Sequence, residues 1–133
     1  MWLLVFILVS ICSICAGLIA GQQIKVFLKR HKTIADEYVL EEFKFLVRRQ
    51  MYMVYFLLLL NVVGLFLNVV VIINHGLLGF IIVLAINAYS FCQSQYFRKL
   101  EKKARSLDTA DELIARKYYL INNTWVNKAL PDF

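Results

Sequence analysis

Hydrophobic residues dominate two blocks of the chain, and polar and charged residues follow each block. Residues 2–24 contain no formally charged side chain, and neither do residues 50–97. A helix needs about 20 apolar residues to cross the roughly 30 Å hydrocarbon core of a bilayer, so the first block predicts one crossing. As a single helix the second block would be about 72 Å long at 1.5 Å per residue, which predicts two crossings.

A polar triplet, Asn74-His75-Gly76, interrupts the second block near its middle. Asn and Gly adopt turn conformations readily, and a His side chain prefers water or the membrane interface to hydrocarbon. We therefore predict a transmembrane helical hairpin over residues 51–97, with its turn at residues 74–76. The preceding transmembrane helix is expected over residues 1–24.

Charged residues gather in two islands, residues 25–49 and residues 98–133, and basic groups outnumber acidic ones in both. Three crossings put both islands on one side of the membrane, and the positive-inside bias makes that side the cytoplasm. The sequence thus predicts an all-α membrane protein with three transmembrane helices, its N-terminus outside and its C-terminus inside. The bacterial cytoplasmic (inner) membrane is the expected location, with the mitochondrial inner membrane as the alternative.

Composition supports this class, because 61% of the 133 residues are hydrophobic and only 18% are charged. Soluble domains have about 25% charged residues. A formal net charge of +6 is compatible with nucleic-acid binding, but the sequence contains no recognisable nucleic-acid-binding module. We assign the Lys and Arg side chains to membrane topology and to contact with anionic lipid headgroups.

Two amphipathic helices are predicted on the cytoplasmic side, one in residues 25–50 and one in the tail of residues 98–133. Thr33 is the expected N-cap of the first and Asp108 that of the second. Segments this short cannot cover an apolar face by themselves, so we predict that a partner subunit or the membrane surface covers both faces. The residues of these faces are Val39, Phe43, Leu46, Ile114, Tyr118, Ile121 and Trp125.

Amides and small residues inside the apolar spans are the candidate interaction site. An amide in hydrocarbon is costly unless it is paired, so these side chains should face other helices, with Gly64 letting backbones approach closely. A polar pore or a substrate lining is the alternative role. The predicted helix–helix interaction residues are Asn61, Gly64, Asn68, Gly79, Asn87 and Ser90.

Cys12 and Cys15 form a C-x-x-C pair, but they lie inside an apolar span, where thiolates are disfavoured, and no second pair completes a metal site. We interpret them as packing residues, with a redox or metal role as the alternative. The chain has no nucleophile–base constellation, P-loop or dinucleotide fingerprint. We therefore expect no enzyme activity, no catalytic or cofactor-binding residues, no metal and no cofactor.

Two functions fit these features. The main expectation is a non-catalytic subunit that packs into a larger membrane protein complex and stabilises or regulates it, with other integral membrane subunits as partners. The alternative is a self-assembling, homo-oligomeric pore or lesion former. The predicted topology, with three spans, an outside N-terminus and a basic tail, resembles that of phage three-span holins. The resemblance is one of topology, and no residue motif is shared.

Overall fold

The computed structural model describes all 133 residues, and its three helices hold 86% of them. α1 comprises Trp2–Arg30, α2 comprises Glu37–Arg105 and α3 comprises Glu112–Asn127. Two-residue strands, β1 (Thr33–Ile34) and β2 (Asp108–Thr109), lie in the connections between the helices. The predicted all-α class fits this structure, with the two short strands as the only departure.

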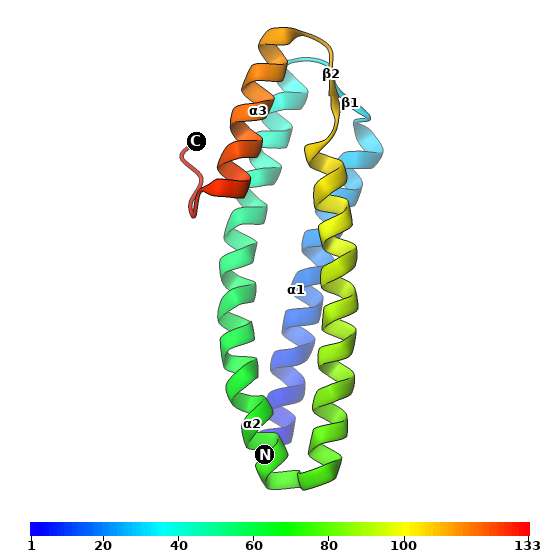
Figure 1. Cartoon of the computed structure of the whole chain (residues 1–133), viewed down its shortest axis with the longest axis vertical. Helices are drawn as coiled ribbons and strands as arrows, with labels where there is room; N and C mark the ends of the chain where they lie inside the picture. The colour runs from blue at the N-terminus through cyan, green and yellow to red at the C-terminus, as the bar shows by residue number, and fades with distance from the viewer.

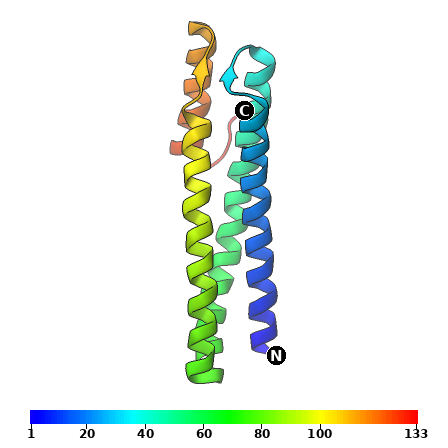
Figure 2. The same cartoon turned by 90° about the vertical axis from the view of Figure 1, so that its right-hand side faces the viewer.

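α2 is a helical hairpin rather than one straight rod. Gly76 has φ 55° and ψ −131°, a conformation that glycine adopts far more readily than any residue with a Cβ. The chain reverses direction there, so three helical rods lie side by side in an elongated bundle (Figures 1 and 2). We call residues 37–75 the first arm and residues 77–105 the second arm. This reversal lies within the break that was expected at residues 74–76.

Apolar side chains cover much of the outside of the bundle. α1 and α2 are both long and apolar enough to cross a membrane. Phe66 on the first arm is 64% exposed, and Ile73 near the turn is 77% exposed. Soluble proteins rarely leave so many large apolar side chains facing outward together, whereas lipid covers such surfaces favourably.

α1 continues beyond its uncharged segment, which was expected to end at residue 24, and ends at Arg30. The last turn contains Lys29 and Arg30, whose positive charges are favourable at the negative end of the helix dipole. His31 follows in an extended conformation, and its backbone N–H donates to the Phe27 carbonyl oxygen at 2.9 Å. The basic residues therefore extend the helix rather than end it.

The helix starts differ from the predicted caps. α2 begins after Asp36, whose Oδ1 accepts a hydrogen bond from a first-turn backbone N–H at 2.9 Å. α3 begins after Asp111, whose Oδ1 accepts from a backbone N–H at 2.7 Å. The predictions for Thr33 and Asp108 were wrong, because these residues face each other in the parallel β1–β2 pair. That pairing joins segments 75 positions apart in the chain.

A large apolar cluster closes the end of the bundle where α3 packs. It contains 12 buried residues from α1, β1, both arms of α2 and α3. The ring of Phe43 lies at its centre, 4.9 Å from the Tyr118 ring and 6.0 Å from the Trp125 ring between centroids. A smaller cluster near the Gly76 turn consists of Phe6, Leu67, Val71 and Val83.

The seven residues of the predicted surface-contact faces all belong to the large cluster or pack against it. Five are buried within it and two are partly buried against it. The chain's own helices therefore supply the cover that was expected from a partner or from the membrane surface, because the two faces pack against each other and against α1. The buried five are Val39, Phe43, Leu46, Tyr118 and Ile121, and the partly buried two are Ile114 and Trp125.

Candidate functional site

A small polar cavity lies between the three rods, in the stretch that separates the two apolar clusters. Its volume is about 60 Å³, enough for a few water molecules, since one needs roughly 15 Å³ of such space. Gly64 and several apolar side chains complete its wall. The polar lining, which we call the amide seam, consists of Ser10 and Ser13 of α1, Asn61 and Asn68 of the first arm, and Asn87 and Ser90 of the second arm.

Hydrogen bonds within the seam are few. Asn61 Nδ2 donates to the Leu57 carbonyl oxygen at 2.8 Å, and Asn87 Nδ2 donates to the Val83 carbonyl oxygen at 2.7 Å. Both are bonds to the preceding turn of the same helix. One bond crosses between the arms, from Asn87 Nδ2 to Asn68 Oδ1, and at 3.5 Å it is long.

The seam is open on one side. Asn61 and Asn87 are exposed, whereas Asn68 is half-buried. An Asn side chain offers two N–H donors and an acceptor oxygen, so Asn61 uses only part of its capacity in its single side-chain bond. Leaving such a group unpaired in an apolar medium costs about 1–3 kcal/mol. The exposed amides are therefore groups that a further polar partner would stabilise.

The two predicted glycines have different surroundings. A Cβ built on Gly64 meets no atom within 4 Å, so no backbone of this chain approaches Gly64 closely. Gly64 faces the cavity, where there is open space. A Cβ on Gly79 would lie 2.6 Å from the Val71 carbonyl oxygen. Gly79 thus allows the two arms to lie close together beside the turn, outside the seam.

Two glutamines that the sequence reasoning did not select attach α1 to both arms. Gln50 is fully buried, and its Nε2 donates to the Ala20 carbonyl oxygen at 3.1 Å and to Gln23 Oε1 at 3.2 Å. Gln93 Nε2 donates to the Ile14 carbonyl oxygen at 3.0 Å. These acceptors are mostly backbone oxygens of another helix, which a sequence pattern does not reveal.

Ser10 and Ser13 were also missed, although a signal for them existed. Their spacing of three residues puts both hydroxyls on one face of α1, as the Asn61 and Asn68 spacing does on the first arm. That face of α1 is the one turned toward the cavity. Small polar residues at helical spacing, as well as amides, therefore mark the cavity side of a helix in this sequence.

The three cysteines lie outside the seam. Cys12, Cys15 and Cys92 are free thiols on exposed positions. The structure places no group of three or more His, Cys, Asp or Glu side chains that could hold a metal ion.

An exposed ion pair and a buried hydroxyl connect α3 to α2 and to the loop that follows α2. Lys117 of α3 forms an ion pair with Glu37 of α2, and this hydrogen bond lowers the pKa of the Glu37 carboxyl below its ordinary value of 4.5. The Tyr118 hydroxyl donates to the Ala104 carbonyl oxygen at 2.5 Å and accepts from the Leu107 N–H at 3.2 Å. Burial raises the pKa of Tyr118 above its ordinary value of 10.0, because burial disfavours the phenolate.

Comparisons with protein-family models, with curated proteins and with solved structures find no match for this chain.

Proposed function

We propose that the protein is a non-catalytic membrane subunit that crosses the bilayer three times and binds a helix of another integral membrane protein along the amide seam. The three crossings are α1 and the two arms of α2, with the N-terminus outside and α3 in the cytoplasm. The bacterial cytoplasmic membrane is the proposed location.

The shape of the bundle supports this orientation. The loop after α1 and the tail that contains α3 lie at one end, and the N-terminus and the Gly76 turn lie at the other (Figure 1). Both basic islands therefore lie at a single end of the bundle, as the positive-inside bias requires of cytoplasmic segments. The opposite end has His75 and no Lys, Arg, Asp or Glu.

The open amide seam is the observation on which the binding proposal rests. Bilayer hydrocarbon offers no water to the exposed amides of Asn61 and Asn87, so a polar side chain of a neighbouring helix is their best available partner. Interhelical bonds of this kind contribute about 0.6–2 kcal/mol each in membranes. Two or three such bonds, together with packing of the flanking apolar residues, are enough to select one helix over bulk lipid.

A partner helix accounts for the seam better than a shared pore does. The seam residues of one copy surround a cavity within that copy, whose volume is only about 60 Å³. A homo-oligomeric opening, as in a holin-like lesion, needs amides that face away from their own bundle toward a common axis. Within one copy, Asn87 Nδ2 already donates to Asn68 Oδ1 and to the Val83 carbonyl oxygen. Of the exposed amides of the seam, only Asn61 and the Asn87 oxygen therefore remain for an outside group, which suits one neighbouring helix better than a polar channel wall.

Affinity purification of the tagged full-length protein in a mild detergent, followed by mass spectrometry, tests the proposal. The double variant Asn61→Leu/Asn87→Leu should reduce recovery of the partner about tenfold, since 1.4 kcal/mol corresponds to a factor of ten. Asn74→Leu is the matched control, because Asn74 Nδ2 makes the same type of bond, to the Val70 carbonyl oxygen at 2.8 Å, outside the seam.

Each outcome of this experiment is decisive. Equal recovery with the double variant and with Asn74→Leu would show that the seam does not bind the partner. Recovery of the protein alone as a monomer would contradict the subunit proposal altogether. A second copy as the sole partner would favour the homo-oligomeric alternative.

Thiol labelling tests the three crossings separately. In a variant without the native cysteines, His75→Cys should react with a membrane-impermeant maleimide in intact cells. Lys32→Cys and Lys128→Cys should react only after the membrane is permeabilised. Labelling of positions 32 and 128 from opposite sides would refute the three-span arrangement.

A further inference from the structure

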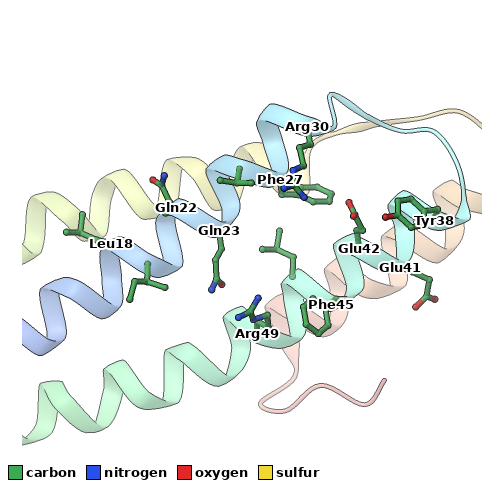
Figure 3. Close-up of a pocket in the computed structure, with 13 residues that line it drawn as sticks. Leu18, Gln22, Gln23, Phe27, Arg30, Tyr38, Glu41, Glu42, Phe45 and Arg49 are labelled. Atoms are coloured by element: carbon green, nitrogen blue, oxygen red, sulfur yellow. The ribbon is translucent and has the colours of Figure 1, made fainter.

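A long groove runs between α1 and the first arm, on a different part of the bundle from the amide seam. Its upper part, beside the large apolar cluster, has a volume of about 930 Å³ (Figure 3). A second hollow of about 630 Å³ continues it toward the middle of the bundle. The two share Ile19, Gln23 and Arg49 in their walls, so they adjoin along the bundle, and we call them together the α1–α2 groove.

The chemistry of the groove changes along its length. Its upper part carries Arg30 of α1 and Arg49 of the first arm, and Figure 3 shows Gln23 and Arg49 pointing toward each other across it. Its lower part is mainly apolar and extends to Cys12 and Phe56. From residue 23 to residue 12, α1 advances about 16 Å at 1.5 Å per residue, which matches one leaflet of a roughly 30 Å hydrocarbon core.

The two arginines of the groove are not bonded to any carboxylate. Neither Arg30 nor Arg49 forms an ion pair within the protein. The two acidic side chains in the same wall have other partners. Glu41 Oε1 lies 3.4 Å from Lys44 Nζ, whose charge balances it, and Glu42 Oε2 lies 2.6 Å from His31 Nε2, an ion pair while that imidazole is protonated.

Arg49 is also held in a defined position. Its guanidinium carbon lies 5.3 Å from the centre of the Phe45 ring, a cation–π arrangement that leaves the N–H groups free for an anion. A guanidinium presents its donors as a rigid fork that fits the oxygens of a phosphate. Positive charge at the interface, above an apolar channel one leaflet deep, is complementary to a phosphate headgroup with an acyl chain.

We propose that the α1–α2 groove binds one molecule of an anionic phospholipid. The phosphate interacts with Arg49 at the cytoplasmic interface, Arg30 adds positive charge farther along the groove, and one acyl chain follows the lower groove toward Cys12 and Phe56. This site rests on the membrane placement given in the proposed function, and it is independent of any partner at the amide seam.

Native mass spectrometry of the full-length protein in a mild detergent tests this site. The probes are phosphatidylglycerol and phosphatidylcholine with identical acyl chains, each added over a concentration series. We expect phosphatidylglycerol to bind with a stoichiometry of one. Phosphatidylcholine has the same phosphate, but its choline ammonium cancels the net negative charge and is repelled by the arginines, so we expect it to bind about tenfold more weakly.

Arg49→Gln should weaken phosphatidylglycerol binding about tenfold. Arg48→Gln is the matched control: it removes the same charge from the adjacent position, but Arg48 lies over the Phe133 ring, 6.0 Å from its centroid, and outside the groove. Ile19→Trp tests the apolar part without changing charge. Ile19 is 53% exposed, so the larger ring fits on the surface and fills the groove.

The site is supported if Arg49→Gln and Ile19→Trp both reduce binding while Arg48→Gln does not. Equal losses for Arg48→Gln and Arg49→Gln would show that general surface charge attracts the lipid, and would overturn the proposal. Equal affinity for the two lipids, or unchanged binding in Ile19→Trp, would overturn it as well. Thiol labelling at positions 32 and 75 in the same variants tests the membrane topology separately from the groove. Weak lipid binding with the expected labelling would contradict the groove proposal alone, whereas unexpected labelling would contradict the three-span arrangement.

Discussion

Replacing Gly79 by Ala should destabilise the helical hairpin. The new Cβ would lie 2.6 Å from the Val71 carbonyl oxygen and 3.0 Å from the His75 Cβ. The first of these atoms belongs to a helix backbone, so it cannot turn aside as a flexible side chain would, and the arms must separate. Overpacking of this kind costs about 1–3 kcal/mol. A contact of 2.6 Å with a backbone atom belongs to the upper part of this range, about 2–3 kcal/mol. The better helix propensity of Ala returns about 1 kcal/mol, which leaves a net loss of about 1–2 kcal/mol.

Gly64→Ala is the matched comparison, because it makes the same chemical change in the same helix. A Cβ at Gly64 meets no atom within 4 Å, so only the gain in helix propensity remains, about 0.5–1 kcal/mol. The two variants should therefore lie on opposite sides of the wild type in stability. Reversible unfolding in mixed detergent micelles, followed by circular dichroism, measures both. A Gly79→Ala variant as stable as the wild type, or a Gly64→Ala variant less stable than it, would refute the contact geometry beside the turn.

Two further predictions concern the α3 end. Tyr118→Phe should destabilise the protein by about 1–3 kcal/mol, because it leaves the Leu107 N–H and the Ala104 carbonyl oxygen without their hydroxyl partner. Hydrogen exchange measures this effect, and the Leu107 amide should exchange faster in the variant. In the wild type, burial raises the folded-state pKa of Tyr118 above its ordinary value of 10.0. The stabilisation by the protonated hydroxyl is therefore complete below pH 10 and is lost as the pH rises further. Tyr118→Phe should abolish this loss of stability at alkaline pH. The folded-state pKa of Glu37 is lowered by its bond to Lys117, so that pair stabilises α3 docking above pH 4.5 and ceases to do so as the pH falls through the lowered pKa. Glu37→Gln should reduce the acid dependence of α3 protection in hydrogen exchange, with the part due to the Lys128–Asp132 pair remaining. An unchanged acid profile would contradict this account.

Features that depend on local sequence were predictable. The turn at Gly76 follows from residue types that tolerate reversal, and the common face of Asn61 and Asn68 follows from their helical spacing. The hairpin also explains why Asn68 and Asn87 lie opposite each other. In an antiparallel pair of helices joined at residue 76, positions at similar distances from the turn are aligned.

Features that depend on long-range contact were not predictable. Thr33 and Asp108 are good N-cap residue types, yet their mutual pairing moves the helix starts to Asp36 and Asp111. The apolar faces of the two charged segments were visible in sequence, but nothing in their periodicity indicated that each would cover the other. Gln50 lies at the edge of an uncharged block, and its role depends on backbone oxygens of α1.

The distribution of contacts along the bundle explains how it can hold an open polar site. At one end, 12 buried residues, the β1–β2 pair and the buried Gln50 fix the three rods relative to one another. At the other end, the Gly76 turn and the close approach at Gly79 fix the arms. The amide seam lies between these two restraints, so its side chains keep their relative positions without a partner. For the proposed partner helix, a site held open in this way would reduce the conformational entropy lost on binding, so less of the energy of the few interhelical hydrogen bonds would be spent on ordering the seam.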